Sequence, residues 1–420
     1  MLSKITELCN GKPVAIFGKG ASGNAVKELL DSLGIKSVFY AESDAEIFDE
    51  SNVNKHSLIV YSPAFRPDHN WIALAEKNGA TTICETDLSA LVWNGKIIAI
   101  TGTNGKTTLT KFLTKVLNES GFEAISAGNI GYPLSKYCAK FSNNKNKIVV
   151  YELSSFQTSK IKFLKPDILL WTNFAPDHLD WHTDIVEYFN AKNNLLNATI
   201  GKAFVGNSVV DFAKSNDITL RKNIEILEES GIAQSPAPFD NSIQSQNFKM
   251  AMEVGKELGI PKEKFVESAK TFELPDFRFS TPIEVNQVRF YNDSKSTNAH
   301  ATIGALKELK DEKHLIWIGG GKDKNCDLTE LSETICKYAK SAVLIGQTST
   351  KLKILLDGKL SDGVYVCGSM KEAVEKSAEL SKNGSAVLFS PAFSSFGMFS
   401  NYADRGKSFK NEVLCLKNLK

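Results

Sequence analysis

The segment Thr101–Thr108, with the sequence TGTNGKTT, constrains the fold of this 420-residue chain more than any other feature. It directly follows the apolar run Lys96–Ile100 and opens a helix-like stretch, so it predicts a strand, a glycine-rich turn and a helix. In such a turn, backbone N–H groups and the helix dipole face a triphosphate, Lys106 neutralises phosphate charge, and the Thr107 hydroxyl can reach Mg²⁺. The generic pattern has glycine at position 100, where this chain has isoleucine, so the match is to a more specific variant. A glycine turn without a ligand is the alternative.

Short β-branched runs alternate with helical stretches along almost the whole chain. Several of these runs are continuously apolar, which is typical of parallel strands covered by helices on both faces. The alternation predicts a doubly wound α/β architecture. The candidate strands are Val14–Phe17, Ser37–Tyr40, Leu58–Tyr61, Ile97–Ile100, Ile148–Tyr151, Ile168–Trp171, Leu315–Ile318, Ala342–Ile345, Val364–Cys367 and Ala386–Phe389.

The chain is too long for one ordinary domain, and we expect three: residues 1–93, 94–274 and 275–420. A new strand–helix unit begins after Trp93-Asn94-Gly95, and Leu274-Pro275-Asp276 is typical of a linker. The polar stretch Gly231–Gln246, which contains two prolines, is predicted to be a loop inside the second domain.

Composition excludes several classes of protein. A hydrophobic content of 42% and a charged content of 23% are normal for a globular protein, and a net charge of +2 gives no reason to expect nucleic acid or an anionic membrane as a partner. No apolar stretch of about 18 residues predicts a membrane span, and the first residues lack the apolar core of a signal peptide. Seven scattered cysteines without a C-x-x-C pair favour reduced thiols in a cytoplasmic protein over a disulfide framework or a zinc site.

The sequence Gly18–Gly23 satisfies G-x-G-x-x-G directly after the first candidate strand, where a Rossmann-type turn holds a diphosphate. A dinucleotide site would need an acidic residue at the end of the second strand, but Tyr40 stands there and Glu42 follows two residues later. A nicotinamide site is therefore not supported, although the diphosphate of another nucleotide would use the same turn. A tight strand-to-helix connection without a ligand also stays open.

Polar residues recur at the ends of the strands that follow the glycine-rich turn. Glu152 emerges where a carboxylate would meet Mg²⁺ beside that turn, and the glycine-flanked loop Gly128–Gly131 can place the Asn129 amide near phosphate or substrate. His178, flanked by two aspartates in the loop Thr172–Asp180, can ligate a metal as a neutral imidazole, although such a His–Asp pair is often only a surface feature. Lys192 lies on a predicted helix and by itself would be a solvated residue.

These elements together resemble the Mur ligases, the ATP-dependent amide-forming enzymes of peptidoglycan synthesis. The resemblance rests on motifs in order and spacing, and it covers nearly the whole chain. The resemblance is specifically to the branch that adds D-glutamate, and the D-N-P-R motif of the diaminopimelate- or lysine-adding relative is absent. The motifs are TGTNGKTT, GNIG, ELSSFQ, NFAPDHLD and AKN, followed by Asn292–Asn298, Gly320–Lys324, Leu388–Phe396 and Asn401–Gly406.

The resemblance implies a Rossmann-like N-terminal domain that binds a UDP substrate, a central P-loop ATPase domain and a C-terminal Rossmann-like domain that binds an amino acid. It implies catalytic roles for Lys106, His178 and Lys192. The implied ATP contacts are Gly102, Thr103, Asn104, Gly105, Lys106, Thr107, Thr108, Asn247, Arg278 and Asp293. The implied contacts to the UDP substrate are Gly20, Ala21, Ser22, Gly23, Asn129, Ser154 and Gln157, and those to D-glutamate are Thr297, Lys324, Ser395 and Tyr402.

The same resemblance implies two Mg²⁺ ions, one held by Thr107 and Glu152 and one by His178 and Lys192. Because a free ammonium cannot bind a cation, Lys192 would carry a carbamate formed with CO₂. The implied substrates are ATP, UDP-N-acetylmuramoyl-L-alanine and D-glutamate, which are joined through an acyl phosphate with release of ADP and phosphate. A cytoplasmic monomer without nucleic-acid or membrane partners is expected.

The chain departs from the family pattern at several positions. Tyr40 stands where the best-known relatives have an acid near the uridine, and Ser62–Phe65 reads SPAF where they have S-P-G. Gly397 replaces a common aspartate and Tyr402 replaces a phenylalanine. The match of Ser242–Phe248 to the asparagine motif beside the adenine is loose, which weakens the assignment of Asn247 within it.

Three alternatives stay open from the sequence. A sister Mur ligase or a folylpolyglutamate synthetase would share the central domain and differ at both ends. A P-loop ATPase or nucleotide switch would hydrolyse ATP without any amino acid. An NAD oxidoreductase would rest on G-x-G-x-x-G alone.

Overall fold

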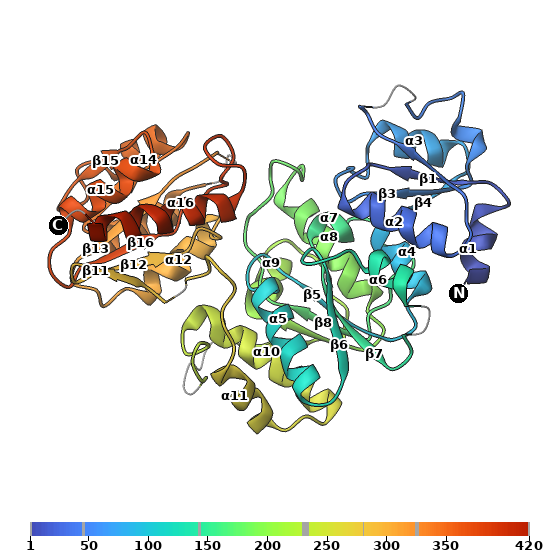
Figure 1. Ribbon diagram of the computed structural model, residues 1–420, viewed down its shortest axis with the longest axis horizontal. Helices are drawn as coiled ribbons and strands as arrows, with labels where there is room; N and C mark the ends of the chain where they lie inside the picture. Colours follow the sequence, from blue (N-terminus) through green and yellow to red (C-terminus); the bar gives the residue numbers. More distant parts are fainter. Residues whose placement is uncertain are drawn as a thin grey trace. The chain divides into compact units, whose positions relative to one another are not determined.

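The computed structural model describes residues 2–43, 47–141, 144–228, 235–279, 281–323 and 327–418. It contains three sheets flanked by helices (Figure 1). The chain forms two compact units, of which the first consists of Met1–Phe174, Asp184–Pro236 and Gln246–Thr271. The second consists of Ala175–Thr183, Ala237–Ser245 and Phe272–Lys420. The predicted α/β architecture is confirmed, whereas the predicted domain boundaries after residues 93 and 274 stay predictions.

The first sheet has the order β2-β1-β3-β4, and all its strands are parallel. Val14 and Ile16 of the central strand face one hydrophobic cluster, and Ala15 and Phe17 face an aromatic one, so the strand is buried on both sides. A Cβ on Gly23 would overlap the carbonyl oxygen of Gly18, so only glycine lets the second helix pack this closely on the first strand. The elements are α1 (Leu2–Cys9), β1 (Val14–Phe17), α2 (Ala21–Ser32), β2 (Ser37–Tyr40), η1 (Val53–Lys55), β3 (Leu58–Tyr61), α3 (Asn70–Lys77), β4 (Thr81–Cys84) and α4 (Glu85–Val92).

The second sheet has the order β10-β9-β8-β5-β7-β6 and is also parallel. Because β5 lies between β8 and β7, the loop that follows it occupies the middle of the carboxyl edge, where parallel sheets bind ligands. The elements are β5 (Lys96–Thr101), α5 (Lys106–Glu119), β6 (Glu123–Gly128), α6 (Leu134–Lys140), β7 (Lys147–Glu152), α7 (Ser155–Thr158), β8 (Ile168–Trp171), α8 (Ile185–Ala198), β9 (Lys202–Gly206), α9 (Asn207–Ser215), β10 (Glu225–Leu227), α10 (Ser242–Leu258) and α11 (Lys262–Lys270).

The third sheet has the order β11-β12-β16-β13-β14-β15, in which the β11–β12 pair is antiparallel. Leu315 and Trp317 of β13 pack with the helices on one face, and Ile316 and Ile318 pack with those on the other. The elements are β11 (Ile283–Val285), β12 (Val288–Asn292), α12 (Ala299–Glu308), β13 (Leu315–Gly319), α13 (Thr329–Tyr338), β14 (Ser341–Leu344), α14 (Ser349–Leu356), β15 (Val364–Val366), α15 (Met370–Leu380), β16 (Ala386–Phe389), α16 (Tyr402–Cys415) and η2 (Leu416–Asn418).

The ten candidate strands are all present, each to within one residue at either end. The predicted loop Gly231–Gln246 is wrong from Ser242 onward, because α10 begins there and Asn241 Oδ1 accepts from the backbone N–H of Gln244 at 2.9 Å. Within the described residues, every helix is too short or too polar to span a lipid bilayer.

Candidate active site

The glycine-rich turn between β5 and α5 is held by residues at the end of the neighbouring strand β8. Asn173 accepts from two backbone N–H groups of the turn, from Thr103 through its carbonyl at 3.1 Å and from Asn104 through its side chain at 2.8 Å. The Thr172 hydroxyl donates to the Asn104 carbonyl at 2.6 Å. The sequence analysis did not predict this role for Thr172 and Asn173. Their position directly after β8, the strand beside β5, is the signal that could have indicated it.

The first turn of α5 is open to an anion. Gly105 caps the helix in the left-handed region, with φ of +88°, and no side chain caps the exposed N–H groups behind it. The Lys106 ammonium folds back over the turn and donates to the carbonyls of Gly102 at 2.7 Å and Thr103 at 2.9 Å. Thr107 and Thr108 follow in the same turn of the helix. The arrangement is suited to a phosphate chain.

Asn247 lies against this turn. It is buried on α10, and a Cβ on Gly105 would stand 2.6 Å from its Oδ1. The adjacent Gln246 donates to the Thr172 carbonyl at 2.8 Å. The structure therefore brings the most loosely matched of the predicted nucleotide contacts next to the glycine-rich turn.

Glu152 ends β7 directly beside β5, in register with Ile100. Its side chain is 1% exposed, and Oε1 accepts from the Asn129 amide at 2.9 Å. Among the residues that the structure describes, Oε2 has no hydrogen-bonding partner. A buried carboxylate with one unpartnered oxygen is costly alone and fits a divalent cation, which prefers oxygen ligands.

Lys192 is not the solvated helix residue that its sequence context alone would predict. Its side chain on α8 is 1% exposed and lies over the Tyr188 ring, with Nζ 4.9 Å from the ring centroid. Nζ donates to the Gly102 carbonyl at 3.1 Å and to the Thr101 hydroxyl at 3.4 Å. Lys106 and Lys192 therefore converge on the same carbonyl oxygen at the start of the glycine-rich turn.

The predicted contacts to the UDP substrate fall into two groups. Asn129 directly follows β6, and its backbone N–H donates to the carbonyl of Glu152, at the end of the neighbouring β7, at 2.9 Å. Ser154 and Gln157 form a capping box at the start of α7, two residues after Glu152. The other group, Gly20–Gly23, lies at the start of helix α2, which follows the first strand of the first sheet. Gly20 and Ala21 are exposed there.

Tyr40 is buried at the end of β2, and its hydroxyl is 2.8 Å from Nε2 of His56. Nδ1 of the same imidazole is 2.8 Å from the Pro13 carbonyl. The Tyr40 side chain is thus held by a residue that lies between η1 and β3.

His178 lies in the segment Ala175–Thr183, which belongs to the second unit. It adopts a φ of +56°, which is uncommon for a residue other than glycine. The carboxylate of Asp177 accepts from the His178 backbone N–H at 2.8 Å and from the Asn298 side chain at 2.9 Å. Because Asn298 is also the N-cap of α12, the loop that carries His178 is attached to that helix.

Asp293 follows β12 and is buried between two hydroxyl groups. Ser296 and Ser390 donate to its Oδ2 at 2.5 and 2.8 Å. Burial raises the pKa of Asp293 to about 7, while these hydrogen bonds and the charge of the partly buried Arg278 act in the opposite direction. The two predicted nucleotide contacts of the second unit are therefore electrostatically coupled.

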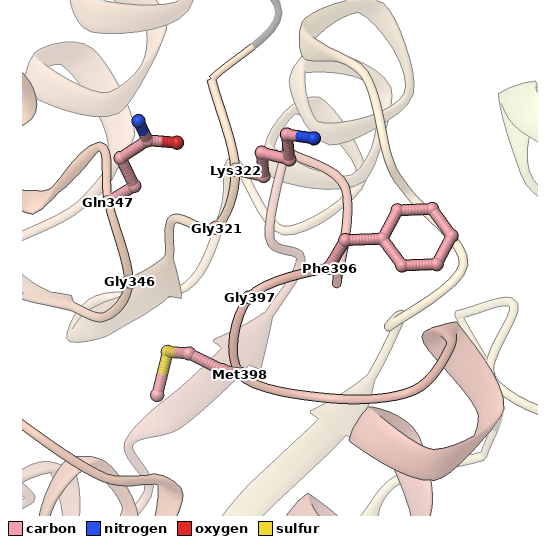
Figure 2. Close-up of a pocket in the computed structure, with 7 residues that line it drawn as sticks. All are labelled: Gly321, Lys322, Gly346, Gln347, Phe396, Gly397 and Met398. Carbon is pink, nitrogen blue, oxygen red and sulfur yellow. The ribbon is translucent and has the colours of Figure 1, made fainter.

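Three of the predicted D-glutamate contacts, Thr297, Ser395 and Tyr402, lie at the carboxyl edge of the third sheet. Thr297 precedes α12, Ser395 follows β16, and Tyr402 begins α16, where the Lys295 ammonium lies 4.2 Å from its ring centroid. Lys324 lies outside the described residues. A cavity of about 340 Å³ opens beside these loops, and Figure 2 shows Lys322, Gln347, Phe396 and Met398 around it.

Comparison with known proteins gives two family matches and full-length relatives. The Mur ligase middle domain matches residues 100–252, and the Mur ligase, glutamate ligase domain matches residues 278–393. UDP-N-acetylmuramoylalanine–D-glutamate ligase of Aquifex aeolicus (strain VF5) is 35% identical, over 95% of this chain and 97% of that protein. The protein of the same name from Thermoanaerobacter sp. (strain X514) is 31% identical, over 97% of this chain and 99% of that protein.

Solved structures agree with this assignment at the level of the fold. MurF ligase of Thermotoga maritima in complex with ADP superposes with a TM-score of 0.60 at 16% identity, covering 89% of this chain and 98% of that one. UDP-N-acetylmuramate–alanine ligase of the same organism superposes with a TM-score of 0.59 at 16% identity, covering 97% of this chain and 100% of that one. With the full-length relatives and the two domain matches, these findings show that the chain belongs to the Mur ligase family.

Proposed function

We propose that this protein is the ATP-dependent ligase that joins D-glutamate to the alanine carboxylate of UDP-N-acetylmuramoyl-L-alanine in the synthesis of peptidoglycan precursors. The observation that carries the proposal is the convergence of Lys106 and Lys192 on the Gly102 carbonyl, at the start of a turn that ends in an uncapped helix. Such a site suits phosphoryl transfer, which depends on positioning and on charge stabilisation.

The phosphate chain of ATP would lie along the turn Gly102–Gly105 and the first residues of α5. Lys106 would leave its two carbonyl partners and bind the γ-phosphate, which a mobile ammonium can do without a change in the backbone. Asn247 lies against the same turn, and Arg278 and Asp293 are the proposed contacts from the second unit.

Thr107 and Glu152 are the proposed ligands of one Mg²⁺, and His178 with carbamylated Lys192 those of a second. When bound, these ions would offset the repulsion between the substrate carboxylate and the phosphates. The unpartnered Oε2 of Glu152 supports the first site.

The neighbouring ammonium group of Lys106 gives a physical reason for a carbamate on Lys192. As ammonium groups, Lys106 and Lys192 place two like charges on one carbonyl oxygen in a largely buried site. A carbamate would turn this repulsion into attraction and supply an anionic ligand. Lys192 could not serve as a metal ligand in its protonated form.

The reaction would proceed in two steps. The alanine carboxylate attacks the γ-phosphorus, the bond to ADP breaks, and an acyl phosphate forms. The neutral amine of D-glutamate then attacks the acyl carbon, phosphate leaves with the bonding electrons, and the nitrogen loses a proton as the amide forms. Lys106 would stabilise the charge on the transferred group in the first step.

The contacts to the UDP substrate and to D-glutamate would come from different parts of the chain. The UDP portion would bind at Gly20–Gly23, and the growing end of the substrate at Asn129, Ser154 and Gln157. The carboxylates of D-glutamate would bind at Thr297, Lys324, Ser395 and Tyr402. We assign residues 1–93, 94–274 and 275–420 to the UDP substrate, ATP and the amino acid respectively, in a cytoplasmic monomer.

The test is phosphate release from Mg²⁺-ATP and UDP-N-acetylmuramoyl-L-alanine, with D-glutamate, L-glutamate, lysine or no amino acid. Release that requires D-glutamate is the expected result. Release with another amino acid would indicate a sister ligase, and release without any amino acid would leave an ATPase or nucleotide switch.

A further inference from the structure

Arg405, one turn into α16, is among the largest fully buried side chains of the protein, with 1% exposure. Its guanidinium makes three hydrogen bonds. Nε donates to the Ser294 hydroxyl at 3.2 Å, one terminal nitrogen donates to the Ser294 carbonyl at 2.8 Å, and the other donates to the Phe393 carbonyl at 2.9 Å. All these acceptors are neutral, so a buried cation is retained here without a directly bonded carboxylate.

The residues around this guanidinium belong to three loops at the carboxyl edge of the third sheet. Ser294 follows β12, Phe393 follows β16, and Gly321 follows β13, and these three strands are neighbours in the order β12-β16-β13. A Cβ on Gly321 would stand 3.3 Å from a terminal nitrogen of Arg405. One side chain therefore bonds to two of the loops and lies beside the third.

The same loops carry the amino-acid contacts that we proposed above. Thr297 is three residues from Ser294, and Ser395 is two residues from Phe393. A further contact, Tyr402, lies on α16 itself, and its carbonyl accepts from the Ser294 hydroxyl at 2.8 Å.

The chemistry of arginine suits this place. A planar guanidinium presents its donors in a fixed fork, so it sets the relative positions of the groups it bonds, whereas a lysine ammonium is a single point with free rotation. Burial lowers the pKa of Arg405 to about 9, while the charge of Asp293 acts in the opposite direction. Holding a cation at this position costs free energy, which a residue with only a packing role would not require.

We propose that Arg405 is a positioning residue that sets the separation of the loops carrying the D-glutamate contacts and thereby determines the affinity for the amino acid. A dicarboxylic amino acid needs two anion-binding groups at a fixed separation, and a displacement of about 1 Å in such a constellation is worth up to about a hundredfold. The inference rests on the proposed function.

The test compares Michaelis constants for the three substrates in the full-length enzyme. For Arg405→Met, which keeps the length of the side chain and removes its donors, we expect the KM for D-glutamate to rise at least about tenfold. The KM for UDP-N-acetylmuramoyl-L-alanine should stay within about twofold, because its proposed contacts lie outside these loops. The KM for ATP should rise less than that for D-glutamate, because only Asp293 among its proposed contacts lies in one of them. Arg405→Lys should restore only part of the affinity, since it returns the charge without the fork.

The matched control is Phe409→Leu, one turn further along α16. Phe409 is fully buried against Phe389, with ring centroids 4.6 Å apart, and it makes no polar contact with the loops. It should lower the melting temperature and leave the KM for D-glutamate unchanged. If Arg405→Met does not fold, Ser294→Ala is the second test, because it removes only the hydroxyl between Arg405 and Tyr402. It should raise the KM for D-glutamate more than the KM values for the other two substrates.

An equal rise in all three KM values, or a rise in Phe409→Leu as large as in the arginine variants, would overturn the inference. So would Arg405→Met or Ser294→Ala with wild-type affinity for D-glutamate. The wild-type enzyme is measured first. If its phosphate release does not depend on D-glutamate, the proposed function fails, which is a separate result from the comparison of variants.

Discussion

Lys106 and Lys192, which lie on two different helices, both donate to the Gly102 carbonyl. This shared contact is the basis for assigning both lysines to the active site. Lys106 belongs to a motif whose spacing already predicts its role. Lys192 belongs to the helical segment Ile185–Ala198, whose local sequence does not distinguish a buried lysine from a solvated one. Its burial follows from the packing of α8 beside the end of β5, which no local pattern encodes.

We predict that Lys192→Ala is nearly inactive and is partly rescued by short carboxylic acids. The small acid would occupy the space of the missing carbamate and supply its anionic oxygens. Phosphate release is measured with and without formate or acetate, with the wild-type enzyme as the control for effects of the acid itself. Wild-type activity in the variant without any acid would mean that Lys192 has only a structural role.

Asp293 allows a prediction about pH. Burial raises the pKa of Asp293 in the folded protein from its ordinary value of 3.8 to about 7, so the folded state binds this proton more strongly than the unfolded state. The resulting stabilisation is fully present below pH 3.8 and is lost as the pH rises to about 7. Between pH 5 and pH 8 the wild type should therefore lose about 2–3 kcal/mol relative to Asp293→Asn, which does not titrate. Denaturant unfolding at the two pH values measures the difference. Equal pH dependence of the two proteins would contradict the prediction.

At the scale of elements, the sequence patterns predict strands more reliably where both faces are covered. Most of the ten candidate strands are apolar runs, whereas the strands that the patterns missed are mostly more polar or lie at an edge. In β10, an edge strand, Glu225 and Ile226 are exposed, and in β6, at the other edge, only Ala124 and Ala127 are buried. The first residues of α10, Ser242–Gln246, were predicted to be a loop because they are mostly polar and because Asn241 before them is equally typical of a loop.

Asn298 joins two elements, because its side chain caps α12 through the Ala301 N–H and also holds Asp177. Asn298→Ala should lower the free energy of unfolding by about 2–3 kcal/mol, since it removes a cap and a donor to a buried carboxylate. Asn298→Ser is the matched variant. It keeps a cap but is too short to reach Asp177, so we expect a loss of about 1–2 kcal/mol. No loss in Asn298→Ser would show that the contact with Asp177 contributes nothing, and equal losses in the two variants would show the same of the cap.

At the scale of the molecule, Asp87 ties the first sheet to the second. This buried carboxylate on α4 accepts from the backbone N–H groups of Lys162, Phe163 and Leu164, at distances between 2.8 and 3.2 Å. Burial raises its pKa, against the effect of these hydrogen bonds. No sequence motif points to this contact, because its two sides lie about 75 residues apart in the chain.

Asp87→Ala should cost about 3 kcal/mol in the free energy of unfolding, because it leaves several buried donors without an acceptor. Asp87→Asn should cost less, since its amide oxygen still accepts. The exposed Asp31, paired with Lys27 on α2, supplies the control, and Asp31→Ala should change stability by less than about 0.5 kcal/mol. If Asp87→Ala is as mild as Asp31→Ala, the contact is not a structural tie.

The most direct test of the ligase assignment follows the oxygen atoms of the substrate. UDP-N-acetylmuramoyl-L-alanine labelled with heavy oxygen in its alanine carboxylate is incubated with the enzyme, Mg²⁺-ATP and D-glutamate, and both products are analysed by mass spectrometry. If the carboxylate is activated as an acyl phosphate, one labelled oxygen appears in the released phosphate and the product is heavier by one glutamyl residue. Unlabelled phosphate, with no glutamyl product, would contradict the account.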